Sequence, residues 1–182
     1  AVKVNSARSQ SADYVIDVMT RAGWQVTEDS FDESNSLRPE LESLTPEPAT
    51  MLGSDAIAGA GAGEVTAEVV PVDIVLDPPR DNTSGCEAAD FEGFPAGAIA
   101  LVQRGVCTFG EKAAFAVEAG ASAVIIFNQG NTPDREGPLT DVTLGSQFEI
   151  PVVTTDFAGG VSLTQPGATA RVNVAFEAIP QR

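Results

Sequence analysis

Residues 97–128 read GAIALVQRGVCTFGEKAAFAVEAGASAVIIFN, and their pattern decides the fold. The apolar run at 98–102 is bounded by glycine and arginine-containing polar sequence, which is typical of a buried strand. Thr108 and Glu111 form a T-x-x-E capping box, which predicts the start of a helix. Gly120 predicts the end of that helix. Residues 122–127 are a second apolar strand. Strand, helix and strand within this length predict a parallel pair joined by a right-handed crossover.

Upstream of this unit the pattern is less regular. Apolar residues recur at helical spacing over 9–22, and residues 24–31 alternate as a strand with one wet face. The acidic, proline-containing stretch 32–48 is interpreted as an irregular connection. Residues 56–63, AIAGAGAG, are interpreted as a flexible linker, because their glycines precede a strand instead of the helix start that a dinucleotide site needs.

Three further strands are predicted on either side of the central unit. Residues 64–76 are rich in valine and contain Pro71, so we expect a sheet edge or a bulge there. Residues 150–155 and 170–179 predict strands, and Asp156 is suited to cap a short helix between them. The fold class is therefore mixed α/β and strand-dominated.

Composition limits the function classes. The chain has 182 residues, enough for one domain with an appendage, and a formal net charge of -16. Such a charge repels phosphate backbones and anionic lipids, so nucleic acid and membrane surfaces are not expected partners. No apolar stretch is long enough to cross a bilayer.

Catalytic chemistry is hard to build from these residues. The chain contains no histidine, which removes the commonest general base and the imidazole ligands of most catalytic zinc sites. Lys112 follows Glu111 in the first turn of the predicted helix, where we expect a solvated charge instead of a catalytic amine. We therefore predict no catalytic residue, no metal ligand and no cofactor in this chain.

Residues 128–148 are polar and predict a mobile surface loop. Their acidic and amide side chains do not match the spacing of an EF-hand calcium loop. Elsewhere, Cys86 and Cys107 either close a loop that stabilises by about 3 kcal/mol in an oxidising compartment or stand as two buried thiols, and composition leaves both readings open.

The segment from Cys86 through Phe109, CEAADFEGFPAGAIALVQRGVCTF, continues as GEKAAFAVEAGASAVIIFN and later as IPVV. This order of motifs resembles the core signature of the protease-associated (PA) domain family. The resemblance implies a small barrel-like β-sandwich flanked by short helices, attached to a peptidase or a sorting receptor. It also implies that Cys86 and Cys107 are bonded to each other.

The same resemblance suggests where a ligand binds. Arg104 and Gly105 resemble the R-G pair of a loop that lines the ligand groove in receptor-like members, and we take Phe109 and Asn128 as further candidate ligand-binding residues. The alternative is structural: Arg104 pairs with an acidic residue, Gly105 serves the turn, and Phe109 belongs to the core.

The opening ARSQSADYVIDVMTRAGWQVTEDSF is similar to the segment before the PA insertion of secreted di-zinc aminopeptidases. We therefore expect residues 1–47 to be a helix-strand segment and linker of a peptidase domain, 48–169 to be the PA domain, and 170–182 to be a strand returning to a catalytic domain that holds the zinc. The first hypothesis is a secreted, non-catalytic module that binds peptide or protein substrate for that adjoining peptidase domain or shapes substrate access to it. A free-standing peptide-binding or sorting module, or a purely structural insertion, are the alternatives.

Overall fold

The computed structural model describes residues 10–26 and 35–178. Residues Leu37–Glu177 form one compact unit, and helix α1 belongs to a second unit, which is described by itself. In chain order the elements are α1 (Gln10–Arg21), β1 (Asn35–Thr45), β2 (Thr50–Leu52), β3 (Ser54–Ala56), β4 (Gly63–Pro71), the 3-10 helix η1 (Ala88–Phe91), β5 (Ile99–Gln103), α2 (Phe109–Glu118), β6 (Ala123–Phe127), the 3-10 helix η2 (Pro133–Arg135), β7 (Val152–Thr155), α3 (Phe157–Ser162) and β8 (Thr169–Ala178).

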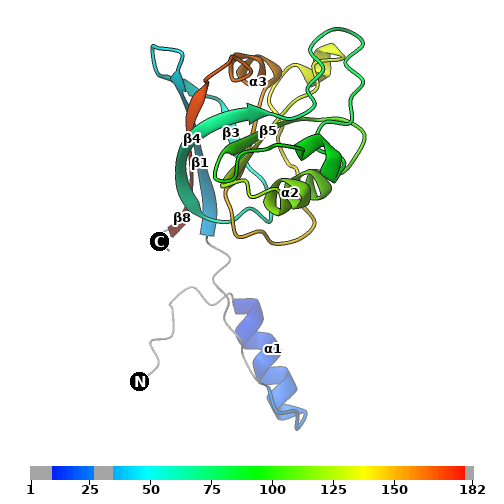
Figure 1. Cartoon of the computed structure of the whole chain (residues 1–182). Helices are drawn as coiled ribbons and strands as arrows, with labels where there is room; N and C mark the ends of the chain where they lie inside the picture. Colours follow the sequence, from blue (N-terminus) through cyan, green and yellow to red (C-terminus); the bar gives the residue numbers. More distant parts are fainter. Residues whose placement is uncertain (1–9, 27–34, 179–182) are drawn as a thin grey trace. The chain divides into compact units, whose positions relative to one another are not determined.

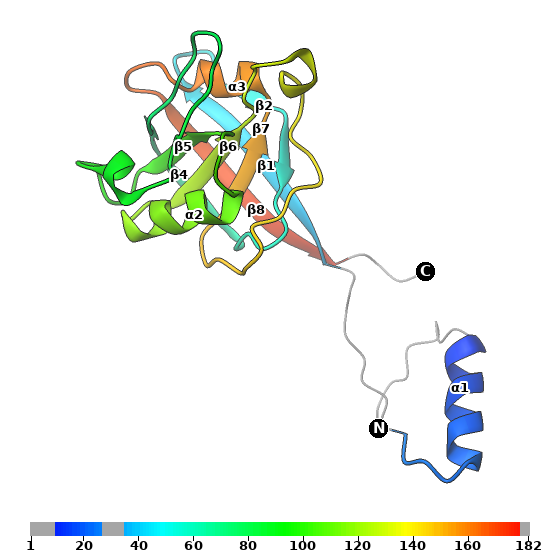
Figure 2. The ribbon, with the colours of Figure 1, turned by 90° about the vertical axis from the view of Figure 1, so that its right-hand side faces the viewer.

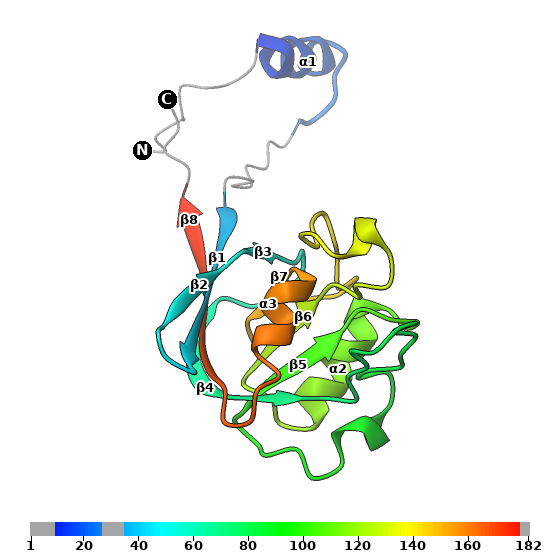
Figure 3. The same ribbon diagram turned by 90° about the horizontal axis from the view of Figure 1, so that it is seen from above.

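The described strands form one sheet in the order β2-β1-β8-β4-β5-β6-β7-β3. Its two end strands, β2 and β3, are separated in the chain by Gly53 alone. Because β2 pairs with β1 while β3 pairs with β7, this short segment links the two ends of the sheet. Figures 1 and 3 show the sheet curved into a nearly closed barrel with few, short helices. The predicted fold class is confirmed.

Strands β5, β6 and β7 run parallel and are buried on both faces. Ala100 and Val102 point into a cluster that includes alanines of α2, while Ile99 and Leu101 point into a second cluster that includes Leu163 after α3. Burial on both faces explains why these strands read as unbroken apolar runs. Helices α2 and α3 both contact β6, and Figure 2 shows these two helices with the parallel strands. The parallel β5-α2-β6 unit was predicted correctly.

Strand β4 lies inside the sheet, so its predicted edge position was wrong. Residues 63–68 pair antiparallel with β8, and residues 69–71 pair parallel with β5. Pro71 is tolerated because it is the final residue of the strand. The ladder continues through the backbone N–H of Val72, which donates to the carbonyl of Leu101 at 3.0 Å.

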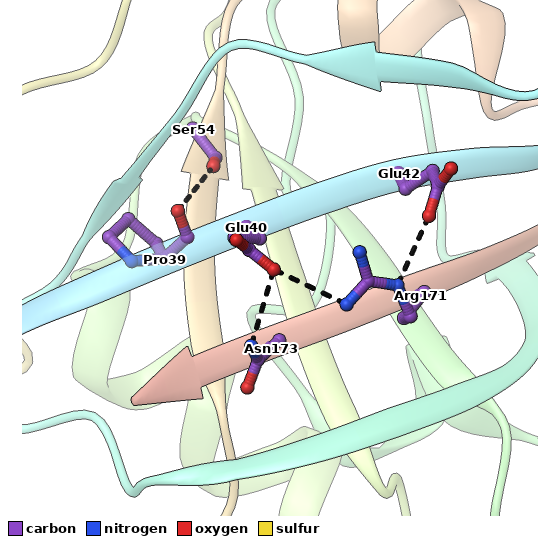
Figure 4. A network of polar contacts seen from close by, with 6 residues as sticks. All are labelled: Pro39, Glu40, Glu42, Ser54, Arg171 and Asn173. Carbon is purple, nitrogen blue, oxygen red and sulfur yellow. Dashed lines mark hydrogen bonds and ion pairs between the residues drawn. The ribbon is translucent and has the colours of Figure 1, made fainter. Parts of the chain in front are cut away.

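The interpretation of residues 32–48 as an irregular connection was also wrong, because β1 occupies most of them. Leu41 of β1 is completely buried in the barrel interior. Beside it, Glu40 and Glu42 accept hydrogen bonds from Arg171 of β8 at 3.3 and 3.1 Å (Figure 4). This strand is stabilised by a partner some 130 positions away in sequence, so local composition did not reveal it.

Residues 56–63 are packed, not a flexible linker. The N–H of Gly61 donates to the carbonyl of Ile150, and the carbonyl of Gly59 accepts from the N–H of Phe148. Ile57 and Ala60 are core residues. Small residues are needed here because two backbone segments run close together.

The predicted surface loop at 128–148 contributes to the interior as well. Asn128, Leu139 and Leu144 are buried, and the N–H of Leu144 donates to the carbonyl of Ala58. The polar composition of this loop had suggested full exposure, but its two leucines anchor it to the core.

Helix α1 confirms the predicted N-terminal helix over Gln10–Arg21. Its apolar side chains are exposed within its own unit: Tyr14 by 69% and Val15 by 55%. Residues 24–26 are not in a strand, and the rest of the strand predicted there lies outside the described residues. Among the described helices, none combines the length and the hydropathy that crossing a membrane requires.

Candidate functional site

The carboxyl ends of β5 and β6 bring two of the candidate ligand-binding residues together. Arg104 directly follows β5 and Asn128 directly follows β6, and the parallel register pairs the strand residues that precede them. The backbone N–H of Arg104 donates to the carbonyl of Phe127 at 2.9 Å, and its guanidinium Nη1 donates to Asn128 Oδ1 at 3.4 Å. Carboxyl ends of parallel strands are common positions for ligand sites in α/β proteins.

The other two candidates have structural surroundings. A Cβ added to Gly105 would lie 2.6 Å from Asn82 Oδ1, so the turn requires glycine for close packing. Phe109 begins α2 and packs, partly buried, against the core cluster on that side of the sheet. These placements agree with the structural alternative for Gly105 and Phe109, and a ligand-binding role for either stays a prediction.

Two arginines that the sequence did not single out complete the polar group at this end of β6. Arg135 of η2 donates through Nη1 to Gln129 Oε1 at 2.7 Å, and Arg80 donates through Nη1 to the carbonyl of Gly130. Asn128, Gln129 and Gly130 therefore each accept a hydrogen bond from a different arginine.

Arg80 is fixed more tightly than the other two arginines. Its Nε donates to the carbonyl of Leu76 at 2.8 Å, and its guanidinium carbon lies 4.6 Å from the ring centroid of Phe157. Stacking on an aromatic face and two carbonyl contacts give this side chain a structural role.

The amide side chains that hold Arg104 and Arg135 are themselves oriented by hydrogen bonds to backbone carbonyls. Asn128 is 1% exposed and Gln129 is 5% exposed. Asn128 Nδ2 donates to the carbonyl of Gly137, and Gln129 Nε2 donates to the carbonyl of Arg80. Because each amide nitrogen is engaged, each amide oxygen is left to accept from its arginine, and Asn128 Oδ1 also accepts from the backbone N–H of Gln129 at 3.0 Å. Gln103 supports the same layer by donating to the carbonyl of Gln129 at 3.0 Å.

The electrostatics of this group are unusual for such an acidic chain. Burial lowers the pKa of Arg104, the neighbouring Arg135 lowers it further, and Asp134 opposes the shift. Among the described residues, no ion pair within 4 Å uses Arg80, Arg104 or Arg135. The arginines at the strand ends are thus held by neutral oxygens.

A second polar feature lies at the disulfide. Cys86 and Cys107 are joined, as the family resemblance implied, with an S–S distance of 2.09 Å.

The expectation that Lys112 is solvated was wrong, because its side chain is fully buried against this bond. Its Nζ donates to the carbonyl of Ser84 and lies 3.7 Å from Cys86 Sγ. Burial lowers the pKa of Lys112 to about 8, although Asp90 and Asp73 oppose the shift. The preceding residue, Glu111, is exposed, because successive residues of a helix point in different directions.

A pocket of about 190 Å³ lies elsewhere, between β3 and the end of β7. Asp55 and Asp156 contribute carboxylates to its wall, and the hydroxyls of Thr154 and Thr155 donate to backbone carbonyls. None of the four candidate ligand-binding residues lines this pocket. The described residues contain no group of three or more histidine, cysteine, aspartate or glutamate side chains able to hold a metal ion.

Comparison with known proteins gives a consistent family. The model of the PA domain family matches residues 65–163. An aminopeptidase from Pseudomonas aeruginosa is 44% identical over 164 residues, which are 85% of this chain and 30% of that protein. A probable lipoprotein aminopeptidase, LpqL, from Mycobacterium tuberculosis is 32% identical over 87% of this chain and 31% of its own length. The chain therefore spans about a third of the length of these relatives.

Solved structures show the same relationship. A zinc aminopeptidase from Bacillus subtilis superposes with a TM-score of 0.63 and 26% sequence identity. The match covers 94% of this chain and 38% of that enzyme.

Proposed function

Because this chain belongs to the PA domain family, as the PA insertion of an aminopeptidase-related protein, we propose that it is a non-catalytic module that binds peptide or protein substrate for an adjoining peptidase domain. The observation that carries the proposal is the match of a histidine-free chain to 30% of an aminopeptidase. Most catalytic zinc sites use imidazole ligands, so the zinc and the hydrolytic chemistry are assigned to the adjoining domain. An oxidising, extracellular location agrees with the Cys86–Cys107 disulfide.

We propose that α1 belongs to that peptidase domain, while β1 and β8, which the sequence also suggested as peptidase segments, are strands of the barrel sheet. The support is an amphipathic helix whose apolar residues Tyr14, Val15 and Val18 are exposed in the described unit. Exposed apolar stripes of this kind are normally covered by another element of the same protein. The remaining two thirds of the relatives' length offers such an element.

For the binding site, we propose Arg104 and Asn128 at the carboxyl ends of β5 and β6, with Gly105 and Phe109 shaping the adjacent turn and helix start. Arg104 supplies a planar donor in a protein of strongly negative charge, which suits a carboxylate-bearing peptide. A purely structural insertion is the second candidate. It is favoured by the close packing of Gly105 on Asn82 and by the contribution of Phe109 to the core.

The experiment is calorimetric titration of short peptides into this chain, with Arg104→Ala as the site variant. Arg21→Ala is the matched control, since it removes the same charge from an exposed ion pair on α1. We expect peptide binding that Arg104→Ala weakens and Arg21→Ala leaves unchanged. No binding of any peptide by the folded chain would support the structural candidate instead.

A hydrolysis assay tests the non-catalytic part of the proposal. The chain is incubated with aminoacyl nitroanilides, with and without added zinc, and we expect no turnover above the buffer rate. Turnover that copurifies with the chain and disappears with chelator would contradict the assignment of catalysis to another domain.

A further inference from the structure

Arginines are scarce in this protein, and their distribution is uneven. The whole chain has 26 acidic residues against 10 basic ones, so a carboxylate partner is easy to find. Arg171 has two such partners, Glu40 and Glu42. Arg104 and Arg135 instead donate to the side chains of two consecutive residues, Asn128 and Gln129, and Arg135 also lowers the pKa of Arg104.

Both side chains are half-buried, and each donates one side-chain hydrogen bond, Arg104 to Asn128 and Arg135 to Gln129. A guanidinium has several N–H donors in a planar fork, so most of the donors of Arg104 and Arg135 remain available. Neutral amide oxygens hold these groups in place without cancelling their charge. Two like charges at one site raise the free energy of the folded state unless an anion lies between or beside them.

The support beneath the pair is rigid. Asn128, Gln129 and Gln103 are buried, and their remaining amide groups are hydrogen-bonded to backbone carbonyls. A site whose donors are positioned in advance loses little conformational entropy when it binds. The pKa of Asp134 is lowered by a hydrogen bond from Thr132 and further by both arginines, so its exposed carboxylate lies near them. Among the described residues it nevertheless forms no ion pair within 4 Å with either arginine.

From this geometry we infer that Arg104 and Arg135 form a two-arginine site for the terminal α-carboxylate of a peptide. The assignment rests on the proposed peptide-binding function. An aminopeptidase acts at the amino end of its substrate. A non-catalytic site that binds the same peptide can therefore recognise its carboxyl end. Paired guanidiniums match the planar, two-oxygen geometry of that carboxylate.

The test is titration of tetra-alanine with a free carboxyl terminus into the whole chain, followed by ¹⁵N–¹H NMR spectra and calorimetry. The same peptide with an amidated terminus is the ligand control. We expect amidation to weaken binding by about tenfold, since it removes the charge-assisted hydrogen bonds. We expect Arg135→Gln and Arg104→Gln each to weaken binding of the free-carboxyl peptide by a similar factor. Arg21→Gln, which makes the same charge change on α1, should leave binding unchanged.

The outcomes separate this inference from the proposed function. If both peptides bind equally and Arg135→Gln has no effect, the carboxylate site is overturned while peptide binding stands. If neither peptide binds although the NMR spectrum is that of a folded chain, both are overturned. Inorganic phosphate is titrated as a further arm. Binding of phosphate without binding of the peptide would show a general oxyanion site and overturn the assignment to a peptide terminus.

Discussion

The first turn of α2 places two titratable neighbours in opposite surroundings. Glu111 is solvated and its pKa is lowered, first because its carboxylate accepts hydrogen bonds from Thr108. Lys112 turns inward, and burial lowers its pKa to about 8. The helical rotation between successive residues produces this difference, and it decides that Glu111 contributes to the helix cap while Lys112 contributes to the interior.

The cap itself gives a prediction for Thr108. Its Oγ1 accepts from the N–H of Glu111 at 3.2 Å, and its own N–H donates to Glu111 Oε2 at 2.8 Å. Thr108→Ala removes the first of these bonds, together with the one that Oγ1 donates to Glu111 Oε2 at 2.7 Å, and should lower the free energy of unfolding by about 1 kcal/mol. The measurement is chemical denaturation. Thr140→Ala, in an exposed position with a single 3.4 Å contact, is the control and should have little effect.

The buried lysine predicts a pH dependence with a defined sign. Unfolded Lys112 keeps its proton up to its ordinary pKa of 10.5, while folded Lys112 releases it at about 8. Between these values the unfolded state binds more protons, so the free energy of unfolding rises as pH increases, by at most about 1.4 kcal/mol per pH unit. Unfolding midpoints in urea at pH 7 and at pH 9.5 measure it.

The lysine content of the chain makes this test specific. Lys112 and Lys3 are the two lysines of the sequence, and Tyr14 is its one tyrosine, so no other lysine or tyrosine lies in Leu37–Glu177. Lys112→Met keeps a long apolar stem and removes the charge, and should abolish the rise in stability. An equal rise in Lys112→Met would mean that the dependence comes from another group.

Among the helices and strands, those whose stabilising interactions are local in sequence were predicted correctly, and those stabilised by distant residues were not. The strand 122–127 and the capped helix before it were predicted correctly, because their signals are apolar runs and caps within a few residues. Strand β1 and the packed stretch 56–63 were misread, since both are stabilised by distant partners. The candidate site divides in the same way. Arg104 was found through a motif, whereas Arg135 carries no motif and its relation to Gln129 depends on the folded loop.

The misread glycine stretch supports a prediction with an internal control. A Cβ on Gly61 would lie 2.5 Å from the carbonyl oxygen of Glu149, where a backbone must shift. We expect Gly61→Ala to lower the free energy of unfolding by about 2 kcal/mol, through overpacking of two fixed segments. Gly53→Ala is the control, because its Cβ would meet no atom within 4 Å. Equal stability of the two variants would mean that the 56–63 segment adapts as a linker does.

For the whole molecule, the sequence predicted the fold class but not how the barrel is completed. Strand order depends on pairings such as β1 with β8 and β3 with β7, which join residues more than 90 positions apart. No local pattern specifies such pairs. The division at residue 47, expected from the sequence, therefore stays a prediction that needs its own test.

Two truncated variants provide this test. The described members of both core clusters lie between Leu41 and Val174. Deleting residues 1–34 spares all of them, so we expect the free energy of unfolding of the barrel to change by less than about 0.5 kcal/mol. Deleting residues 1–47 removes β1 with its buried Leu41 and breaks both ion pairs of Arg171.

The second truncation should be far more damaging than the first, because it combines several costs. Loss of a fully buried leucine alone costs about 2–5 kcal/mol in a core that cannot collapse around the gap. The edge of β8 would also lose its backbone partner, and Arg171 would face the exposed edge without its carboxylates. Unfolding in urea, monitored by circular dichroism, compares the two variants with the whole chain. If the 48–182 variant unfolds at the same midpoint as the 35–182 variant, β1 contributes nothing to the barrel and the functional unit begins at residue 48, as the sequence alone suggested.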